Sequence, residues 1–180
     1  MTALQSADLA FVRPSKRALD EAINQSTVEA EEKGYVHVAL VVHEQGQLTV
    51  IEATADSGAV ERPLTSFLQD HEGLVDFYRL KDGPRNPTAI VKRARQFIGQ
   101  PYNHGFFENG PGLYCSQLVT RAFSDEQVFK EEPLQFGPNG TILPHWLDYY
   151  RKLQRAIPIK ELGSSPNSLL RSHSLIALHV

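Results

Sequence analysis

Four apolar runs divide the chain into candidate strands. They cover residues 9–12, 35–42, 48–55 and 74–80, and each is bounded by glycine, proline or polar residues. Their short length and their content of β-branched and aromatic residues are typical of strands rather than helices. A short polar connection with Gly46 joins the second run to the third, so these two runs are expected to form a β-hairpin. A fifth run, at residues 156–159, predicts a last edge strand.

Helical periodicity marks four other segments. Residues 15–25, 88–98 and 145–153 place apolar side chains three or four positions apart, which predicts amphipathic helices. Residues 63–69 predict a shorter helical turn. Thr88 is expected to cap the helix that it opens, because a threonine side chain can accept a hydrogen bond from the first helical turn.

The order of these elements predicts one α+β domain, in which an antiparallel sheet packs against helices. We assign this domain to residues 1–162. Residues 163–180 are expected to form a weakly packed C-terminal tail, because their first part is rich in serine and asparagine. The last part of this tail, residues 175–180, is apolar enough to dock on the domain.

Composition and charge limit the function classes. A length of 180 residues is enough for one domain with a substantial core. The net charge of −3, without any basic run, gives no attraction for nucleic acid, so no nucleic-acid partner is expected. The chain shows no signal-peptide pattern and no run of membrane-spanning length, which favours a cytoplasmic protein without an integral membrane segment. None of these features indicates the oligomeric state.

Cys115 is the only cysteine, so it cannot form an internal disulfide, and it is the first candidate for chemistry. It follows a loop rich in glycine and proline and precedes Leu118, Val119, Ala122 and Phe123, which share one helical face. A cysteine at the start of a helix meets unpaired backbone N–H groups and the positive end of the helix dipole, and both favour a thiolate. The alternative is that Cys115 is one more small buried apolar residue.

His37 is the candidate base, since it alone among seven histidines lies in the middle of a strongly predicted strand. If residues 45 and 46 form a two-residue turn, residue 44 pairs with residue 47 and His37 lies opposite Thr54. Glu52 then shares the face of His37 as its diagonal neighbour, close enough for a hydrogen bond. A three-residue loop would put Glu52 on the other face. The alternative is a half-buried His37 bonded to a backbone carbonyl, with Glu52 in solvent.

Metal and cofactor chemistry has little support in the sequence. Zinc needs three or four ligands at short spacing, and one cysteine with scattered histidines does not supply them. His37 and His43, six residues apart on one predicted strand, are only a weak metal pattern. No phosphate-binding glycine loop with lysine is present, so no cofactor is expected. Phe106, Phe107 and Trp146 are candidates for the wall of a hydrophobic slot, or for ordinary core packing.

Six segments, in order, carry a resemblance to a known family. They are Asp8-Leu9-Ala10-Phe11-Val12, Tyr35-Val36-His37-Val38-Ala39, Val50-Ile51-Glu52-Ala53, Phe77-Tyr78-Arg79-Leu80, Ile98-Gly99-Gln100-Pro101-Tyr102-Asn103 and Tyr114-Cys115-Ser116-Gln117-Leu118-Val119. With these segments the chain resembles the YiiX/YebB-like family of circularly permuted, NlpC-type, papain-like cysteine amidases. The resemblance implies a permuted papain-like fold, in which the histidine precedes the cysteine along the chain.

The resemblance also implies roles for four residues. Cys115 is the implied nucleophile, His37 the base and Glu52 the group that orients the base, in agreement with the pattern of the residues themselves. Tyr102 is implied near the site as a hydrogen-bond donor to the oxyanion, beside the backbone N–H of Cys115. For Tyr102 the alternative is a packed loop tyrosine.

The implied reaction is hydrolysis of an amide bond in a small peptide or an amino-acid amide. Two alternatives stay open. One is a lipid-directed thiol acyltransferase or phospholipase similar to the lecithin–retinol acyltransferase group, which shares the permuted order. The other is an inactive module that binds a peptide in the same cleft.

Three positions depart from the family pattern. Ala7 stands where the family usually has glycine, Asn103 where it often has aspartate, and Gln117 where it often has glutamate. None of them is part of the implied catalytic group. The last two are expected to change what borders the pocket.

Overall fold

The computed structural model describes residues 2–29 and 33–180. Its main sheet contains β1 (Leu9–Val12), β2 (His37–Glu44), β3 (Gln47–Thr54), β4 (Gly58–Pro63), β5 (Val75–Leu80) and β8 (Leu175–Leu178). These strands lie in the order β4-β3-β2-β1-β5-β8, and every neighbouring pair is antiparallel. The antiparallel sheet predicted from the alternating apolar runs is therefore confirmed, with β4 as a strand that the pattern did not predict.

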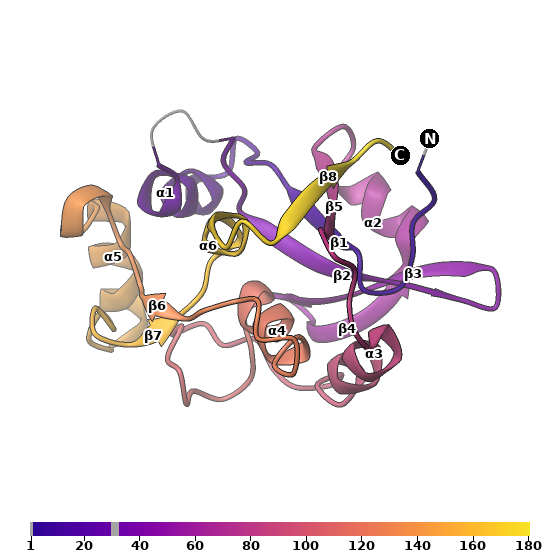
Figure 1. Ribbon diagram of the computed structural model, residues 1–180. Helices are drawn as coiled ribbons and strands as arrows, with labels where there is room; N and C mark the ends of the chain where they lie inside the picture. Colours follow the sequence, from indigo (N-terminus) through magenta and orange to yellow (C-terminus); the bar gives the residue numbers. More distant parts are fainter. Residues whose placement is uncertain (1, 30–32) are drawn as a thin grey trace.

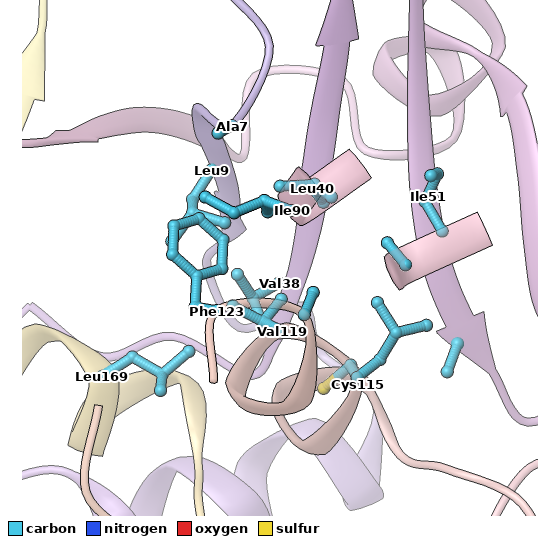
Figure 2. Close-up of a cluster of buried hydrophobic side chains, with 14 of the residues drawn as sticks. Ala7, Leu9, Val38, Leu40, Ile51, Ile90, Cys115, Val119, Phe123 and Leu169 are labelled. Carbon is cyan, nitrogen blue, oxygen red and sulfur yellow. The ribbon is translucent and has the colours of Figure 1, made fainter. Parts of the chain in front are cut away.

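Helices cover both faces of this sheet. Figure 1 shows α2 (Leu64–Asp70) on one side and α3 (Pro87–Arg95) with α4 (Cys115–Ala122) on the other. Side chains alternate along β2, so Val38 and Leu40 pack towards α3 and α4, whereas Ala39 and Val41 pack towards α2. The result is two buried apolar layers, one on each face of the sheet. Figure 2 shows the first layer, with Cys115 at its border.

A smaller helical unit lies beside the sheet. It contains α1 (Ala18–Thr27), α5 (Pro144–Leu153), α6 (Pro166–Arg171), the short strand pair β6 (Glu132–Pro133) and β7 (Leu162–Gly163), and a 3₁₀ turn at Pro138–Gly140. Its apolar cluster contains Ala22 of α1 and Trp146 and Tyr150 of α5. The indole N–H of Trp146 donates to the hydroxyl of Ser26 at 2.8 Å, which ties α5 to α1.

The β2–β3 hairpin has the two-residue turn that the sequence predicts. Gln45 and Gly46 have φ values of 50° and 75°, and positive φ at both central positions is the signature of a type I′ turn. The pairing of residue 44 with residue 47 is confirmed, and the ladder continues to Leu40 and Ile51. Beyond this pair, β2 continues to pair with β1 and β3 continues to pair with β4. His37 and Thr54, which are predicted to lie opposite each other, are therefore not paired in the β2–β3 ladder.

Two local predictions are wrong. Asn86, not Thr88, caps α3, because its side chain accepts from the backbone N–H of Ala89 at 3.0 Å while Pro87 takes the first helical position. Residues 156–159 do not form a strand. Ile157 packs against the apolar cluster of the helical unit instead, so the apolar character of this run serves a side-chain contact without any sheet pairing.

The segment after residue 163 differs from the expected weakly packed tail. It forms α6 and then β8, which pairs with β5 at the edge of the main sheet. Leu169 is 1% exposed because it packs into the layer between the sheet and α4. Residues near the two ends meet as well, since the backbone N–H of Thr2 donates to the carbonyl of His179 at 2.7 Å (Figure 1).

Candidate active site

Cys115 is the first residue of α4, as the sequence predicts. Its side chain is buried at the border of the main core, with 8% of the residue exposed. The preceding backbone N–H, of Tyr114, donates to the side-chain oxygen of Gln117 at 3.4 Å, which closes the first turn of the helix. The thiol therefore lies at a helix N-terminus, where the dipole favours a negative charge.

His37 and Glu52 form the contact that the hairpin register predicts. Nε2 of His37 lies 2.6 Å from Oε2 of Glu52, and the Glu52 side chain is fully buried. The side chain of Cys115 also interacts with the His37 ring and raises the pKa of this histidine. Since Nε2 faces Glu52, the Nδ1 edge of the ring is the one left for the thiol. The imidazole of His37 thus lies between the sulfur of Cys115 and the carboxylate of Glu52.

The charges in this series stabilise one another. Burial by itself lowers the pKa of His37, but the hydrogen bonds to Cys115 and Glu52 outweigh it and raise that pKa from 6.5 to about 10. Burial raises the pKa of Glu52, and the hydrogen bond and charge of His37, with the charge of Arg62, reverse this effect and lower it. The imidazole is therefore protonated at neutral pH beside an ionised Glu52.

Arg62 also belongs to this group, although no pattern in the sequence indicates it. Its Nε donates to Oε1 of Glu52 at 2.5 Å, so each oxygen of this carboxylate has its own charged partner. The guanidinium also pairs with Asp70 and lies over the ring of Phe67, 5.4 Å from its centroid. In the β3–β4 ladder Glu52 faces Val60, so Arg62 is its diagonal neighbour, by the same geometry that links His37 to Glu52.

His71 lies on the α2 side of the His37 ring, with 5.9 Å between the ring centroids. Burial lowers the pKa of His71, and the positive charge of His37 lowers it further. The ring of Phe67 lies 6.3 Å from that of His37. The imidazole of His37 therefore has an uncharged, largely apolar surface on this side.

Tyr102 lies on the loop that leads into α4. Its backbone forms a bridge with Leu113, two residues before Cys115. Gly112 permits this close approach, because it has a φ of 79° and a Cβ there would lie 1.8 Å from the carbonyl oxygen of Pro101. Burial raises the pKa of Tyr102 well above 10, and the nearby charge of Cys115 raises it further, so its hydroxyl keeps its proton.

Asn103 and Gln117, two of the positions that depart from the family pattern, support this loop. They are 2% and 1% exposed, and the amide nitrogen of Asn103 donates to the side-chain oxygen of Gln117 at 3.4 Å and to the carbonyl of Phe107 at 2.7 Å. Neither residue lines the cavity itself, so their effect on what borders it passes through the loop that they hold. The third position, Ala7, has a φ of 73°, which explains the preference for glycine there.

A cavity opens beside Cys115, between α4 and the helical unit. Its apolar wall is formed by Ile23, Val36, Phe106, Leu134, Phe136 and Trp146. Tyr102 and Tyr114 lie on the same wall. Of the three aromatic residues expected to wall a slot, Phe106 and Trp146 do so, whereas Phe107 lies elsewhere, under the guanidinium of Arg155.

No group of three or more histidine, cysteine, aspartate or glutamate side chains could hold a metal ion within residues 2–29 and 33–180. His43 lies at the exposed end of the β2–β3 hairpin, away from His37 at the start of the same strand. In the same part of the chain, no helix is long and apolar enough to cross a membrane.

Comparisons with known proteins complete this description. A family model described as "Permuted papain-like amidase enzyme, YaeF/YiiX, C92 family" matches residues 3–177. The chain is also similar to a solved structure titled metalloprotein yiiX from Escherichia coli O157:H7, DUF1105, with a TM-score of 0.79, 20% sequence identity, and coverage of 97% of this chain and 96% of that chain. At this identity the likeness concerns the fold. No curated protein matches the chain significantly.

Proposed function

Because the chain belongs to the permuted papain-like amidase family, we propose that it is a cysteine hydrolase that cleaves an amide bond with Cys115 as nucleophile. Membership confirms the resemblance and the permuted papain-like fold predicted from the sequence. The observation that carries the proposal is the buried series of Cys115, His37 and Glu52, with 2.6 Å between imidazole and carboxylate. A structural role for a lone cysteine does not require this arrangement.

In the proposed reaction, the Cys115 thiolate attacks the substrate carbonyl carbon, and the new C–S bond gives a tetrahedral oxyanion. The imidazolium of His37 then gives its proton to the leaving nitrogen, the C–N bond breaks, and the amine departs. A water molecule attacks the resulting thioester while His37 takes its proton. The C–S bond breaks and the carboxylic acid leaves. The site is then back in its starting state, with a Cys115 thiolate and a His37 imidazolium.

The oxyanion needs hydrogen-bond donors. We assign this role to the hydroxyl of Tyr102 and to the backbone N–H of Cys115, which lies in the first turn of α4 and has no hydrogen-bond partner among residues 2–29 and 33–180. The high pKa of Tyr102 supports the assignment, because only a protonated hydroxyl can donate. Within the described part of the chain this hydroxyl has no hydrogen-bond partner, which leaves it available to the substrate.

Glu52 holds the ring of His37 in the orientation that aims Nδ1 at the thiol. Its negative charge also stabilises the imidazolium that donates to the leaving group. Arg62 has no direct role at the thiol in this mechanism. It fixes the second oxygen of Glu52 and so restricts the carboxylate to one orientation.

The substrate class proposed from the family is a small peptide or an amino-acid amide. The direct test is to mix the protein with dipeptide amides and with acyl-lipid esters, quench within the first turnover, and examine Cys115 by mass spectrometry. A mass increase that corresponds to the acyl part of a peptide amide supports the amidase. If no substrate of either kind leaves an acyl group on Cys115 and none is cleaved, an inactive peptide-binding module explains the fold better.

A lipid-directed thiol acyltransferase is the second candidate. One observation favours it: the wall of the cavity beside Cys115 is mainly apolar. The two activities share the thioester and differ in the acceptor that releases the acyl group, water in one and an alcohol or amine in the other. Incubation of the trapped thioester with each acceptor distinguishes them.

A further inference from the structure

Residues 163–167 join β7 to α6, and they have no part in the reaction steps described above. They open the segment for which the sequence predicts a weakly packed tail. Ser164 and Asn167 are nevertheless only 5% and 2% exposed, so both are buried polar residues that the mechanism does not use. Because burial of a polar group is costly unless it is hydrogen-bonded, their partners show what this segment holds.

Ser164 is bound to α4 through all three of its polar groups. The hydroxyl of Ser116, the residue after Cys115, donates to the carbonyl of Ser164 at 2.9 Å. The hydroxyl of Ser164 lies 3.1 Å from that of Thr120, one turn further along the helix. Its backbone N–H donates to the hydroxyl of Tyr114 at 3.2 Å. The two shorter contacts keep the segment on α4 if the longest one is removed.

Asn167 binds the chain at the point where it enters β2. Its side-chain oxygen accepts from the backbone N–H of Tyr35 at 2.8 Å, two residues before His37. Its amide nitrogen donates to the hydroxyl of Thr27 of α1 at 2.8 Å. Tyr35 is buried and lies just outside the β1–β2 ladder, which begins with His37. The hydrogen bond from Asn167 therefore fixes the backbone where the strand that carries His37 starts.

The other contacts between α4 and β2 are apolar. Val38 of β2 shares one buried layer with Leu118 and Val119 of α4. Apolar contacts are non-directional and tolerate small shifts, whereas catalytic groups have to be held to within about 0.5 Å. Hydrogen bonds at both ends of residues 163–167 restrict such shifts, because they are directional. Figure 1 shows the helix that follows, α6, between α1 and α4, where it can link them.

We propose that residues 163–167 set the separation between the thiol of Cys115 and the imidazole of His37. Ser116 and Asn167 are then positioning residues, since each joins this segment to one side of the reacting pair. The inference rests on the proposed function, because it takes these two groups as that pair. It predicts that loss of either hydrogen bond weakens the contact between thiol and imidazole while both groups remain present.

The first test compares Asn167→Ala with Asn86→Ala. Each change removes an asparagine oxygen that accepts from one backbone N–H, that of Tyr35 in the first case and that of Ala89 in the second. Asn86 lies at the exposed N-terminus of α3, so both variants should lose stability but only Asn167→Ala should lose activity. A shift of about 1 Å should lower kcat by about a hundredfold. KM should change little, because Asn167 does not line the cavity.

The pH titration of His37, followed by NMR, measures the contact without any substrate. Burial lowers the pKa of His37, and the side chains of Cys115 and Glu52 raise it to about 10. If the thiol moves away in Asn167→Ala, the titration should move to lower pH, but only part of the way, because Glu52 stays in place. Alkylation of Cys115 by iodoacetamide should slow in the same variant. A loss of folding stability alone would move neither quantity.

Ser116→Ala tests the other end of the segment. It removes one hydroxyl and leaves the backbone of α4 unchanged, so it should fold even if Asn167→Ala does not. The same shift of the His37 titration and the same fall in kcat are expected. Ser172→Ala is the matched control, because it also removes a serine hydroxyl that donates to a backbone carbonyl, that of Leu169 at 2.6 Å, and it should leave both quantities unchanged.

The proposal is overturned if either folded variant, Asn167→Ala or Ser116→Ala, keeps the wild-type titration of His37, or if Asn86→Ala shows the same losses. Failure of the proposed function is a different result. The wild-type protein would then cleave no amide, and Cys115 would react with iodoacetamide only after denaturation. The titration of His37 in the variants would still decide whether this segment sets the contact.

Discussion

Nε2 of His37 and Oε2 of Glu52 lie 2.6 Å apart, and this contact links an imidazole at the start of β2 to a carboxylate on β3. The Glu52 side chain is fully buried and that of His37 is only partly exposed, so their charges are weakly screened. The pKa of His37 rises to about 10 because Glu52 and Cys115 both favour the imidazolium. A histidine in this state is a proton donor throughout the neutral range.

The pH dependence of amide hydrolysis should reflect this elevated pKa. The reaction needs the imidazolium, so kcat/KM should fall as pH rises through about 10. Glu52→Gln removes one of the two groups that raise this pKa, so the fall should move to lower pH. Glu61→Gln is the control, because Glu61 pairs with Arg95 and Thr49 and does not touch His37. Equal alkaline limits in the wild type and Glu52→Gln would contradict the assigned role of Glu52.

Alkylation by iodoacetamide reports the state of the thiol without any substrate. Cys115 should react at near-neutral pH at least about tenfold faster than a free thiol peptide, because the helix terminus and the His37 imidazolium favour the thiolate. His37→Ala should remove that excess, whereas His43→Ala, at the exposed end of the hairpin, should not. Labelling that occurs only after denaturation would show that Cys115 is a structural residue.

Tyr102→Phe should lower kcat by about a hundredfold, which is the usual loss when one oxyanion donor is removed. In this variant the alkylation rate of Cys115 and the thermal stability of the protein should change little, since the Tyr102 hydroxyl has no hydrogen-bond partner among the described residues. Tyr114→Phe gives the opposite pattern, because that hydroxyl accepts from the backbone N–H of Ser164 and its loss should cost about 1 kcal/mol of unfolding free energy. Unchanged kcat in Tyr102→Phe would leave this residue with a packing role alone.

Arg62→Met should destabilise the fold and impair the chemistry together. The buried Glu52 would lose one of its two charged partners, at a cost of about 2 kcal/mol in the free energy of unfolding. Adding Glu52→Gln to Arg62→Met should recover part of this stability, because the unpaired charge is then gone, but it should not recover kcat. Denaturant unfolding of the two single variants and the double variant measures the coupling. Additive effects would mean that Arg62 acts independently of Glu52.

These residues show how far the sequence predicts the site. The turn at residues 45 and 46 sets the register that brings Glu52 to His37, and both are local features. The sequence does not indicate Arg62, because the run Gly58–Pro63 carries Glu61, Arg62 and Pro63 and lacks the apolar pattern of a strand. Only the pairing of β4 with β3 makes Arg62 the diagonal neighbour of Glu52.

The cavity wall could not be predicted in the same way. It combines Ile23 of α1, Val36 before β2, Leu134 after β6 and Trp146 of α5, and no local pattern relates these positions. Their meeting depends on how the helical unit packs beside the sheet. The segment after residue 163 has the same difficulty: β8 forms only because β5 offers an edge, and the partner lies about a hundred residues earlier, as the pairing of Phe77 with Leu178 shows.

Gly112 links loop geometry to the position of Tyr102. Gly112→Ala should destabilise the fold by more than the 1–2 kcal/mol that a positive φ costs, because its Cβ would collide with the carbonyl of Pro101. It should also lower kcat by shifting the Tyr102–Leu113 bridge. Gly83→Ala is the matched control, with a φ of 69° and no atom within 4 Å of the added carbon, so it should show the backbone cost alone. Equal losses in the two variants would argue against the close contact.

The hydrogen bond between Thr2 and His179 has a consequence for the order of the site residues along the chain. Because these residues are neighbours in space, the chain can be treated as a ring that happens to be open between them. If a short linker joined them and a new opening were made in the exposed turn at residues 81–82, the cysteine would be translated before the histidine, as in papain itself. The rearranged protein should bring the same thiol, imidazole and carboxylate together in space. The order in which Cys115 and His37 occur in the sequence would then have no effect on the chemistry of the site.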